Sequence, residues 1–255
     1  MLNVDRQKII LNHLYQKGTV KVSKLSEELG VHEETIRRDL KALAQDWDVE
    51  LVYGGAVLKS TVDIPSVQEQ KMQVKRQQNY EIKQLLARKA AALIQPGETI
   101  GLNSGSTVEY ILDYLEDKKP LNIVTLNVHI ASKALLVDGV EVFLPGGKAW
   151  KNSGSMMGPG AAEFIKSFTL DRCFCGVSAV SIGKGISHPN LEEVEGNRAM
   201  VEASLKSYIV TDSSKLNQNG LFKMIDFDDI DGFIVDDDFP KDYREYMEMH
   251  GIEVI

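Results

Sequence analysis

Residues 20–57 read VKVSKLSEELGVHEETIRRDLKALAQDWDVELVYGGAV, and this stretch decides the fold of the N-terminal part of the chain. Between His32 and Leu43, three apolar residues recur at helical spacing and form one stripe: Ile36, Leu40 and Leu43. At about 100° per residue, the cationic side chains fall on the opposite side of the helix, with Glu34 among them: Arg37, Arg38 and Lys41. The pattern therefore predicts a helix with one buried face and one cationic face.

A shorter amphipathic run precedes this helix, with the turn Gly30-Val31-His32 between the two. The apolar residues of the shorter run are Val22, Leu25 and Leu29. Two short helices, a glycine turn and a basic second helix are typical of a helix-turn-helix, whose second helix enters the major groove of DNA. A first helix over residues 5–17 and a β-type segment ending in Gly54-Gly55 extend the pattern to a winged helix. The alternative is an ordinary helical hairpin with a solvated charged face.

The charge of the chain is divided unevenly along its length. The formal net charge of −8 is unusual for a DNA-binding protein, but residues 1–59 carry nine Lys and Arg against nine Asp and Glu. The whole excess lies in residues 60–255, with 20 cationic and 28 anionic side chains. A neutral head with cations on one face can bind DNA, while an acidic body limits non-specific binding.

Several classes of protein are disfavoured by the composition. The longest apolar runs have the length of strands, and the N-terminus has no signal-peptide core, so we expect a cytoplasmic protein without a membrane span. Cys173 and Cys175 are the only cysteines. On a strand they would share one face about 7 Å apart, which is too extended for an easy disulfide. We expect buried thiols and no metal site, because the histidines are scattered without ligand spacing.

Residues 58–80 are polar and rich in Gln, and the domain boundary is expected there. We predict a DNA-binding domain over 1–57, a linker over 58–74 and a second domain over 75–255. A helix is predicted from 79 to 94, and apolar strands alternate with helices after it. Strands are expected at 98–103, 121–127, 140–147, 172–180, 207–213, 231–237 and 252–255. The predicted class is α/β, with a parallel or mixed sheet covered on both faces.

Glycines and hydroxyl groups collect at the predicted carboxyl ends of the strands, where α/β sheets bind ligands. The first strand ends in a loop that leads directly into a helix: Asn103, Ser104, Gly105, Ser106 and Thr107. Free backbone N–H groups and hydroxyls in such a turn suit a phosphate, although Ser and Thr are also routine helix caps. Later strand ends carry Thr125, Asn127, Gly146, Gly147, Asp212 and Lys215. Lys215 among hydroxyls suits a phosphate counter-charge, or is an exposed loop lysine. Glu192, Glu193 and Glu195 are expected on a solvated helix face.

Two sequence motifs in the N-terminal part resemble the DeoR-type (GlpR-like) bacterial transcriptional repressors: Thr35-Ile36-Arg37-Arg38-Asp39-Leu40 and Gly54-Gly55-Ala56. The resemblance continues in order through nearly the whole chain. The chain departs from the family pattern in the wing, where Leu51 and Tyr53 stand in place of Arg and His, and at the helix cap, where His32 replaces Ser. The DNA-contacting residues that follow from the motif and the resemblance are Glu34, Thr35, Arg37, Arg38, Lys41, Tyr53 and Gly54.

The resemblance also implies properties of the second domain. It is expected to resemble ribose-5-phosphate isomerase in fold and to bind a phosphorylated sugar or related metabolite. The family's phosphate loop maps onto 103–107, its Thr-Asn onto Thr125 and Asn127, and its Asp-x-x-Lys onto Asp212 and Lys215. A basic helix position before the sheet maps onto Lys83, or less closely onto Arg76.

Two functions are compatible with this reading. The first is a repressor of a sugar-metabolism operon that binds an operator in duplex DNA. A phosphorylated effector controls its affinity for the operator, by either lowering or raising it. The second is a sugar-phosphate isomerase with an added DNA-binding module. An isomerase needs a base over a sugar carbon, and Asn103 in the loop cannot ionise. We therefore expect a regulator that is not an enzyme and uses no cofactor, and a homo-oligomer (a dimer or tetramer), because helix-turn-helix proteins commonly bind two half-sites.

Overall fold

A computed structural model describes residues 6–7, 9–11, 13–14, 19–46, 49–58, 75–76 and 78–255. The chain divides into two compact units, residues 1–64 and 65–255. That division falls within the linker expected at 58–74. Because most of that segment lies outside the described residues, its boundaries stay a prediction. None of the helices in the described ranges is long and apolar enough to cross a membrane.

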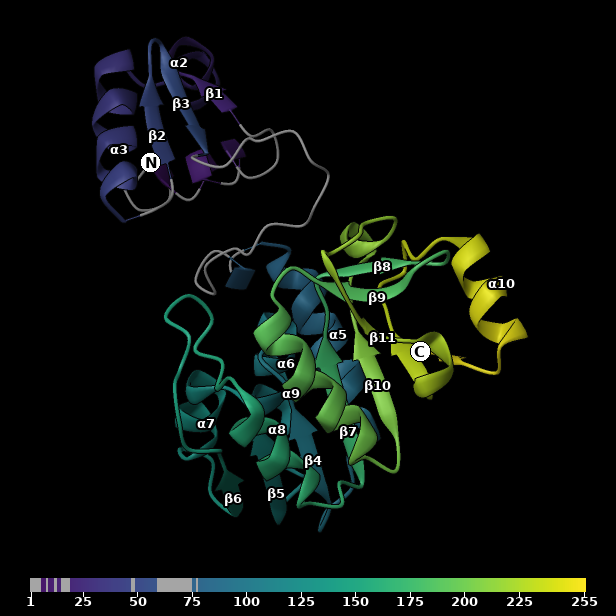
Figure 1. Cartoon of the computed structure of the whole chain (residues 1–255). Helices are drawn as coiled ribbons and strands as arrows, with labels where there is room; N and C mark the ends of the chain where they lie inside the picture. The colour runs from purple at the N-terminus through teal and green to yellow at the C-terminus, as the bar shows by residue number, and fades with distance from the viewer. Residues whose placement is uncertain are drawn as a thin grey trace. The chain divides into compact units, whose positions relative to one another are not determined.

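The N-terminal unit is a winged helix (Figure 1). Helix α2 spans Val22–Leu29 and ends at Gly30, whose φ of +62° favours glycine. Helix α3 spans Glu33–Asp46, and strands β2 (Val49–Val52) and β3 (Gly55–Leu58) follow it. The described residues of the predicted first helix, between 6 and 14, are helical. The core is formed by the predicted stripes and by residues of the first helix and the wing: Ile10, Leu11, Leu14, Val20, Val22, Leu25, Ile36, Leu40, Leu43, Val49 and Ala56.

One strand of this unit was not predicted. Strand β1 (Thr19–Lys21) pairs antiparallel with β3 and gives the sheet the order β1-β3-β2. The segment lies directly before α2 and is only three residues long, so its own pattern does not separate it from the helix. Its pairing of Val20 with Ala56 depends on residues far along the chain, which explains why a local pattern missed it.

The C-terminal unit is built on seven parallel strands in the order β13-β12-β10-β7-β4-β5-β6 (Figure 1). The strands are β4 (Thr99–Leu102), β5 (Leu121–Thr125), β6 (Val140–Phe143), β7 (Arg172–Gly176), β10 (Ser207–Val210), β12 (Gly232–Ile234) and β13 (Glu253–Val254). The helices are α5 (Tyr80–Leu93), α6 (Ser106–Glu109) with the 3₁₀ turn η1 (Tyr110–Tyr114), α7 (Val128–Ala134), α8 (Pro159–Lys166), α9 (Leu191–Glu202) and α10 (Lys241–Met249). The predicted α/β class is confirmed.

Helices cover both faces of this sheet, and a hydrophobic core lies on each. Phe174 belongs to the core beneath α5, whereas Cys173 and Cys175 belong to the other. This alternation follows from the two-residue period of a strand. Both cysteines are free and buried, as predicted.

A second, antiparallel sheet corrects the sequence prediction. The strand predicted over 172–180 is two strands in different sheets, because β7 ends at Gly176 and β8 (Ala179–Ser181) begins a small sheet. Its other members, β9 (Gly185–His188) and β11 (Phe222–Ile225), were not predicted, and the order is β11-β9-β8. These strands have only three or four residues each, which is too short for their apolar residues to show a period, and β11 pairs with β9 across a long separation in the sequence.

Candidate functional site

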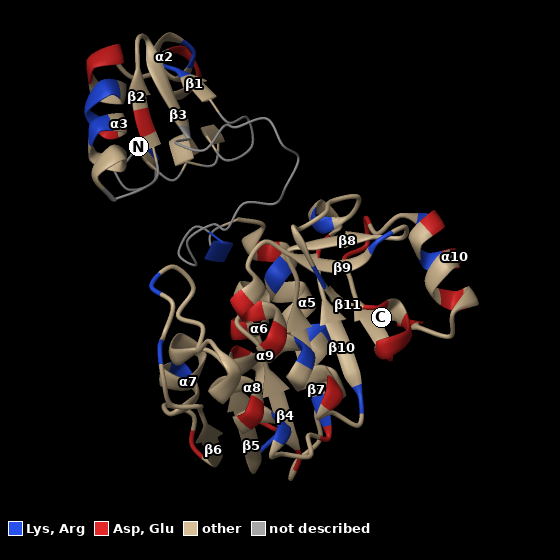
Figure 2. Ribbon diagram, viewed as in Figure 1, with Lys and Arg blue, Asp and Glu red and all other residues tan. Residues whose placement is uncertain are grey.

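The cationic face predicted for α3 is present (Figure 2). Ile36 is fully buried and Leu40 and Leu43 are at most 3% exposed, whereas Arg37, Arg38 and Lys41 are exposed. Glu34 is exposed and Thr35 half-buried at the start of the helix. The helix thus presents its predicted DNA-contacting side chains to solvent.

The three cations differ in their partners. Arg37 is paired with Glu33 at 2.6 Å and lies 3.7 Å from Glu34. The side chains of Arg38 and Lys41 form no hydrogen bond or ion pair with any described residue. An anionic DNA backbone therefore meets two uncompensated charges, while Arg37 must exchange a carboxylate partner to reach it.

A buried ion pair that the sequence analysis missed fixes this helix in the unit. Arg6 of the first helix donates from Nε to Asp39 Oδ2 at 2.5 Å and from Nη2 to Oδ1 at 3.2 Å. Asp39 is 2% exposed and Arg6 is 9% exposed. The hydrogen bond to Asp39 raises the pKa of Arg6. Two parallel bonds of this kind fix orientation as well as distance, so Asp39 positions α3 and does not face DNA.

The wing ends in an exposed apolar tip. Tyr53 is fully exposed, and Leu51 and Val52 are 44% exposed. Gly54 has φ +80°, and its carbonyl accepts a hydrogen bond from Val22 N–H at 2.9 Å. A Cβ at Gly55 would lie 2.0 Å from the Val20 carbonyl oxygen, so only glycine allows β1 and β3 to approach here.

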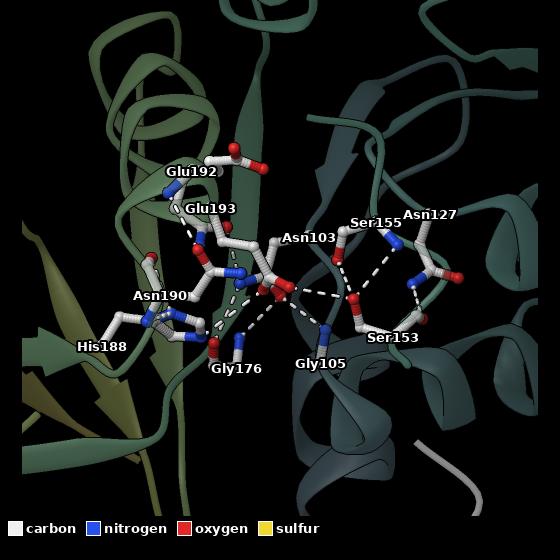
Figure 3. A network of polar contacts seen from close by, with 11 residues as sticks. Asn103, Gly105, Asn127, Ser153, Ser155, Gly176, His188, Asn190, Glu192 and Glu193 are labelled. Carbon is white, nitrogen blue, oxygen red and sulfur yellow. Dashed lines mark hydrogen bonds and ion pairs between the residues drawn. The ribbon is translucent and has the colours of Figure 1, made fainter. Parts of the chain in front are cut away.

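In the C-terminal unit, Asn103 is a structural bridge and not a free ligand (Figure 3). Its Oδ1 accepts hydrogen bonds from the N–H groups of Gly105 at 3.1 Å and Gly176 at 2.9 Å. Its Nδ2 donates to the Gly176 carbonyl at 2.9 Å and to Asn197 Oδ1 at 3.1 Å. An amide side chain has two donors and one carbonyl oxygen. The predicted contact of Asn103 with the effector is thus not supported, because both donors and both lone pairs of the amide are used.

Gly105 is required because two backbone segments pack closely at this position. Its N–H is already bonded to Asn103, and a Cβ there would lie 2.9 Å from the Cα of Gly176. Packing between two backbones therefore selects glycine at this position.

The three hydroxyl residues of the same loop keep their groups available. Ser106 and Thr107 are 7% exposed, Ser104 is half-buried, and none of their hydroxyls bonds to a described residue. No side chain caps α6, which has only four residues, so capping does not explain these hydroxyls.

Thr125 and Asn127 are fully buried and serve the scaffold. Thr125 Oγ1 donates to the Leu102 carbonyl at 2.6 Å. Asn127 caps α7 by accepting from His129 N–H at 2.8 Å, and its Nδ2 donates to the Ser153 carbonyl at 2.8 Å. The predicted effector contacts of both are unsupported, since the Thr125 hydroxyl joins the ends of β4 and β5 and the Asn127 amide holds the loop of residues 144–158. Gly146 and Gly147 are exposed in that loop.

Lys83 and Lys215, which the resemblance assigns to the effector site, lie near enough to interact electrostatically. Lys83 is 4% exposed, and its Nζ donates to the carbonyl of Lys75. Burial lowers the pKa of Lys83 to about 8, and the charge of Lys215 adds to this effect while Asp212 opposes it. Lys215 is half-buried, and its side chain forms no hydrogen bond or ion pair with a described residue. Two neighbouring cations with one nearby carboxylate make a local excess of positive charge.

Asp212 is the carboxylate near Lys83 and Lys215, and it also accepts hydrogen bonds within its own turn. Its Oδ1 accepts from Ser214 N–H at 3.0 Å and from Asn79 Nδ2 at 3.4 Å. Arg76, the less close match for a basic position, is engaged elsewhere, with Nε 2.8 Å from Glu109 Oε2.

Sequence analysis missed a buried polar cluster over the strand ends. Glu193, expected on a solvated face with Glu192 and Glu195, is only 9% exposed. Its Oε1 accepts from Ser153 Oγ at 2.9 Å, and its Oε2 lies 3.5 Å from His188 Nε2 (Figure 3). Glu192 and Glu195 are exposed as expected. The sequence shows three Glu residues near the start of a helix, and this pattern does not reveal which of the three carboxylates faces inward. Among the described residues, no group of three His, Cys, Asp or Glu side chains could hold a metal ion.

A winged helix with a cationic recognition helix, joined to an α/β unit with two neighbouring lysines, is the plan of a DNA-binding regulator that senses a small molecule. The family model for the DeoR-like helix-turn-helix domain matches residues 6–62, and the model for the DeoR C terminal sensor domain matches residues 78–237. The chain therefore belongs to the DeoR family of transcriptional regulators, binds DNA through its helix-turn-helix and carries a sensor domain for a small-molecule effector.

The names of similar proteins agree with this assignment. The chain is 35% identical over 251 residues to the "Putative aga operon transcriptional repressor" of Escherichia coli O157:H7, covering 98% of this chain and 93% of that protein. It is 29% identical to the "Glycerol-3-phosphate regulon repressor" of Escherichia coli K12, covering 100% and 99%. A ribose 5-phosphate isomerase from Plasmodium falciparum superposes with a TM-score of 0.41 and 21% identity, over 55% of each chain. The relatives are regulators, so the alternative of an isomerase-like enzyme is wrong.

Proposed function

We propose that this protein is a repressor of a sugar-metabolism operon whose operator affinity is set by a phosphorylated sugar or related metabolite. The observation that carries the proposal is the pair Lys83 and Lys215, in which a buried ammonium and an uncompensated neighbour create a site for an anion. The hydroxyls of Ser104, Ser106 and Thr107 supply further donors at the strand ends. The name of one relative, the "Glycerol-3-phosphate regulon repressor", supports a phosphorylated metabolite as the ligand class, and the name of the other supports repression of an operon.

The anchoring of Lys75 supports control of the DNA-binding unit. Lys75 follows the segment expected to join the two units, and its carbonyl accepts the hydrogen bond from Lys83. The next residue is held too, because Arg76 pairs with Glu109 at 2.8 Å and its carbonyl accepts from Tyr110 OH at 3.1 Å. An anion that takes the Lys83 ammonium competes with the Lys75 carbonyl, so effector binding and the anchoring of this segment share one group.

The test is the Lys215→Ala variant of the full chain, measured by calorimetry with sugar phosphates and by gel shift with the operator. We expect effector affinity to fall about tenfold, because a charge-assisted contact is lost, while operator affinity without effector is unchanged. Lys184→Ala is the matched control, since Lys184 is an exposed lysine in the turn between β8 and β9. Equal binding of sugar phosphates by the variant and the wild type would contradict the proposal.

We also propose that the protein acts as a homo-oligomer, because helix-turn-helix proteins bind paired half-sites through a two-fold axis. Sedimentation equilibrium of the full chain with and without operator measures this, and a monomer on DNA would contradict it.

A further inference from the structure

The buried cluster around Glu193 has an uneven hydrogen-bond pattern. The Oε1 atom accepts from Ser153 Oγ at 2.9 Å. The Oε2 atom faces only His188 Nε2 at 3.5 Å, which is longer than an ordinary N–H···O bond. A carboxylate can accept about four hydrogen bonds. One oxygen of a nearly buried carboxylate therefore has unused capacity.

The charge of this carboxylate has no cationic partner in the cluster. Burial lowers the pKa of His188, and Lys75 adds to that effect while Glu193 opposes it. The ring is held by the backbone of Asn190, whose N and O atoms lie 3.1 and 3.2 Å from Nδ1. Burial therefore disfavours the charged form of the ring, which is the form that would balance the Glu193 carboxylate.

Neighbouring contacts place Glu193 over the strand ends. Asn197, one helical turn further along α9, is bonded to Asn103 at the end of β4. Ser153, on the other side of Glu193, is bonded to Asn127 at the end of β5. Figure 3 shows the Glu193 side chain directed toward Asn103 and Ser153.

The cationic pair lies on another side of the same region. Lys215 follows β10, and β10 pairs with β7, whose end is bonded to Asn103. The charge of Lys75 lowers the pKa of both Lys83 and His188, so Lys75 lies near both groups. The carboxyl edge of the sheet thus carries a cationic end and an anionic end.

We propose that Glu193 is a specificity-determining residue of the effector site, and that its Oε2 accepts a hydrogen bond from a hydroxyl group of the bound molecule. The inference rests on the proposed function, in which Lys83 and Lys215 bind the phosphate. A carboxylate attracts donors and repels a second anion. The effector class is therefore a phosphomonoester of a neutral polyhydroxyl compound, and a bisphosphate or a phosphorylated acid is excluded.

The experiment compares ligands on the full chain by calorimetry, with inorganic phosphate, fructose 6-phosphate and fructose 1,6-bisphosphate as probes. For the wild type we expect the monophosphate to bind most tightly. For Glu193→Gln we expect the preference for fructose 6-phosphate over inorganic phosphate to fall about tenfold, since a hydrogen bond to a charged acceptor is lost. The discrimination against the bisphosphate falls with it, because the repelling charge is gone.

Two further variants keep the test decisive. Glu192→Gln is the matched control, because Glu192 is the exposed neighbour in the same helical turn and lies 3.9 Å from Lys148. Its preference should equal that of the wild type. Glu193→Asp keeps the charge but shortens the reach, so it should lose the hydroxyl preference and still exclude the bisphosphate. It also serves if Glu193→Gln does not fold, as thermal melting will show.

The outcomes separate the two proposals. If Glu193→Gln weakens all probes equally, Glu193 only holds the loop of residues 144–158, and the inference is overturned. An unchanged preference in both Glu193 variants overturns it as well. If the wild type binds none of the phosphate probes, the proposed function fails together with the inference.

Discussion

The recognition helix α3 and the candidate effector site around Lys83 both depend on cations, but the cations of α3 are exposed whereas Lys83 is buried. Arg38 and Lys41 on α3 are exposed and uncompensated, whereas Lys83 is 4% exposed with its pKa lowered to about 8. Exposed charges act on a long polyanion over a screening length of about 8–10 Å. A buried ammonium interacts strongly only with an anion that reaches it through a shaped site. Cationic side chains thus give long-range attraction to DNA in one unit and selectivity for one kind of anion in the other.

The largest effect should come from removing cations on the DNA side. We expect Arg37→Ala combined with Arg38→Ala to weaken operator binding at least a hundredfold, since each lost base or phosphate contact costs about 1–3 kcal/mol. Neither residue is on the buried stripe, so the fold should survive. Gel shift against Lys184→Ala checks this, and an affinity within twofold of the wild type would mean that α3 does not enter the groove.

The next effect tests whether the exposed face depends on a buried anchor. Asp39→Asn leaves Arg6 with an uncompensated charge, which should destabilise the N-terminal unit by about 3 kcal/mol. Hydrogen exchange of α3 amides measures the change locally. Glu34→Gln, an exposed change on the same helix, should leave exchange unaltered. If Asp39→Asn also leaves it unaltered, the ion pair does not hold the helix.

A third change, Asn103→Asp, tests the hydrogen bonds that hold the strand ends of the sensor domain together. In Asn103→Asp a carboxylate oxygen faces the Gly176 carbonyl, where Nδ2 now donates at 2.9 Å. The loss of a buried donor should cost about 2 kcal/mol of stability. Thermal melting, with Asn152→Asp in the half-buried loop as control, tests it; equal melting of both variants would contradict the bridging role.

The smallest effect concerns the pH dependence of effector binding, which depends on the buried Lys83 of the sensor domain and not on the exposed cations of α3. A bound anion raises the pKa of Lys83, so binding is strongest where the free protein already carries the charge, below about pH 8. Above that pH, affinity for a phosphomonoester should fall by up to about tenfold per pH unit, because Lys83 loses its proton in the free protein. The charge of the ligand does not change in this range, since it is already a dianion above its second pKa of about 6. Calorimetry at pH 7 and pH 9 measures this. Lys215→Ala should move the decline to higher pH by removing a repelling charge, and a flat profile in the wild type would contradict the assignment.

The N-terminal unit was largely predictable because its signals are local. The stripe of Ile36, Leu40 and Leu43 fixes both the buried and the cationic face of one helix. The pair of Arg6 and Asp39 was missed, since the two residues are far apart in the sequence and only the packed fold brings them together.

The candidate effector site was predictable in its residues' neighbourhood but not in their individual roles. Several of the polar residues predicted at strand ends do lie at the carboxyl edge of the sheet, as the bonds of Asn103 to Gly176 show. The clustering of these residues in the sequence did not separate residues that hold the loops, such as Asn103 and Asn127, from those with free groups, such as Ser106 and Lys215. That division depends on where each amide finds its partners. Glu193 was missed because its burial depends on a loop from another part of the chain.

The all-parallel sheet also has a consequence for the order in which the two units form. Neighbouring strands are distant in sequence, as in the pairing of Ile100 with Arg172, and such contacts close slowly. The N-terminal unit is synthesised first and is small, and domains generally fold as they emerge. During synthesis, a chain of this design completes its DNA-binding unit before its sensor exists. The time to fold the sensor therefore sets the earliest moment at which a newly made molecule can respond to its effector.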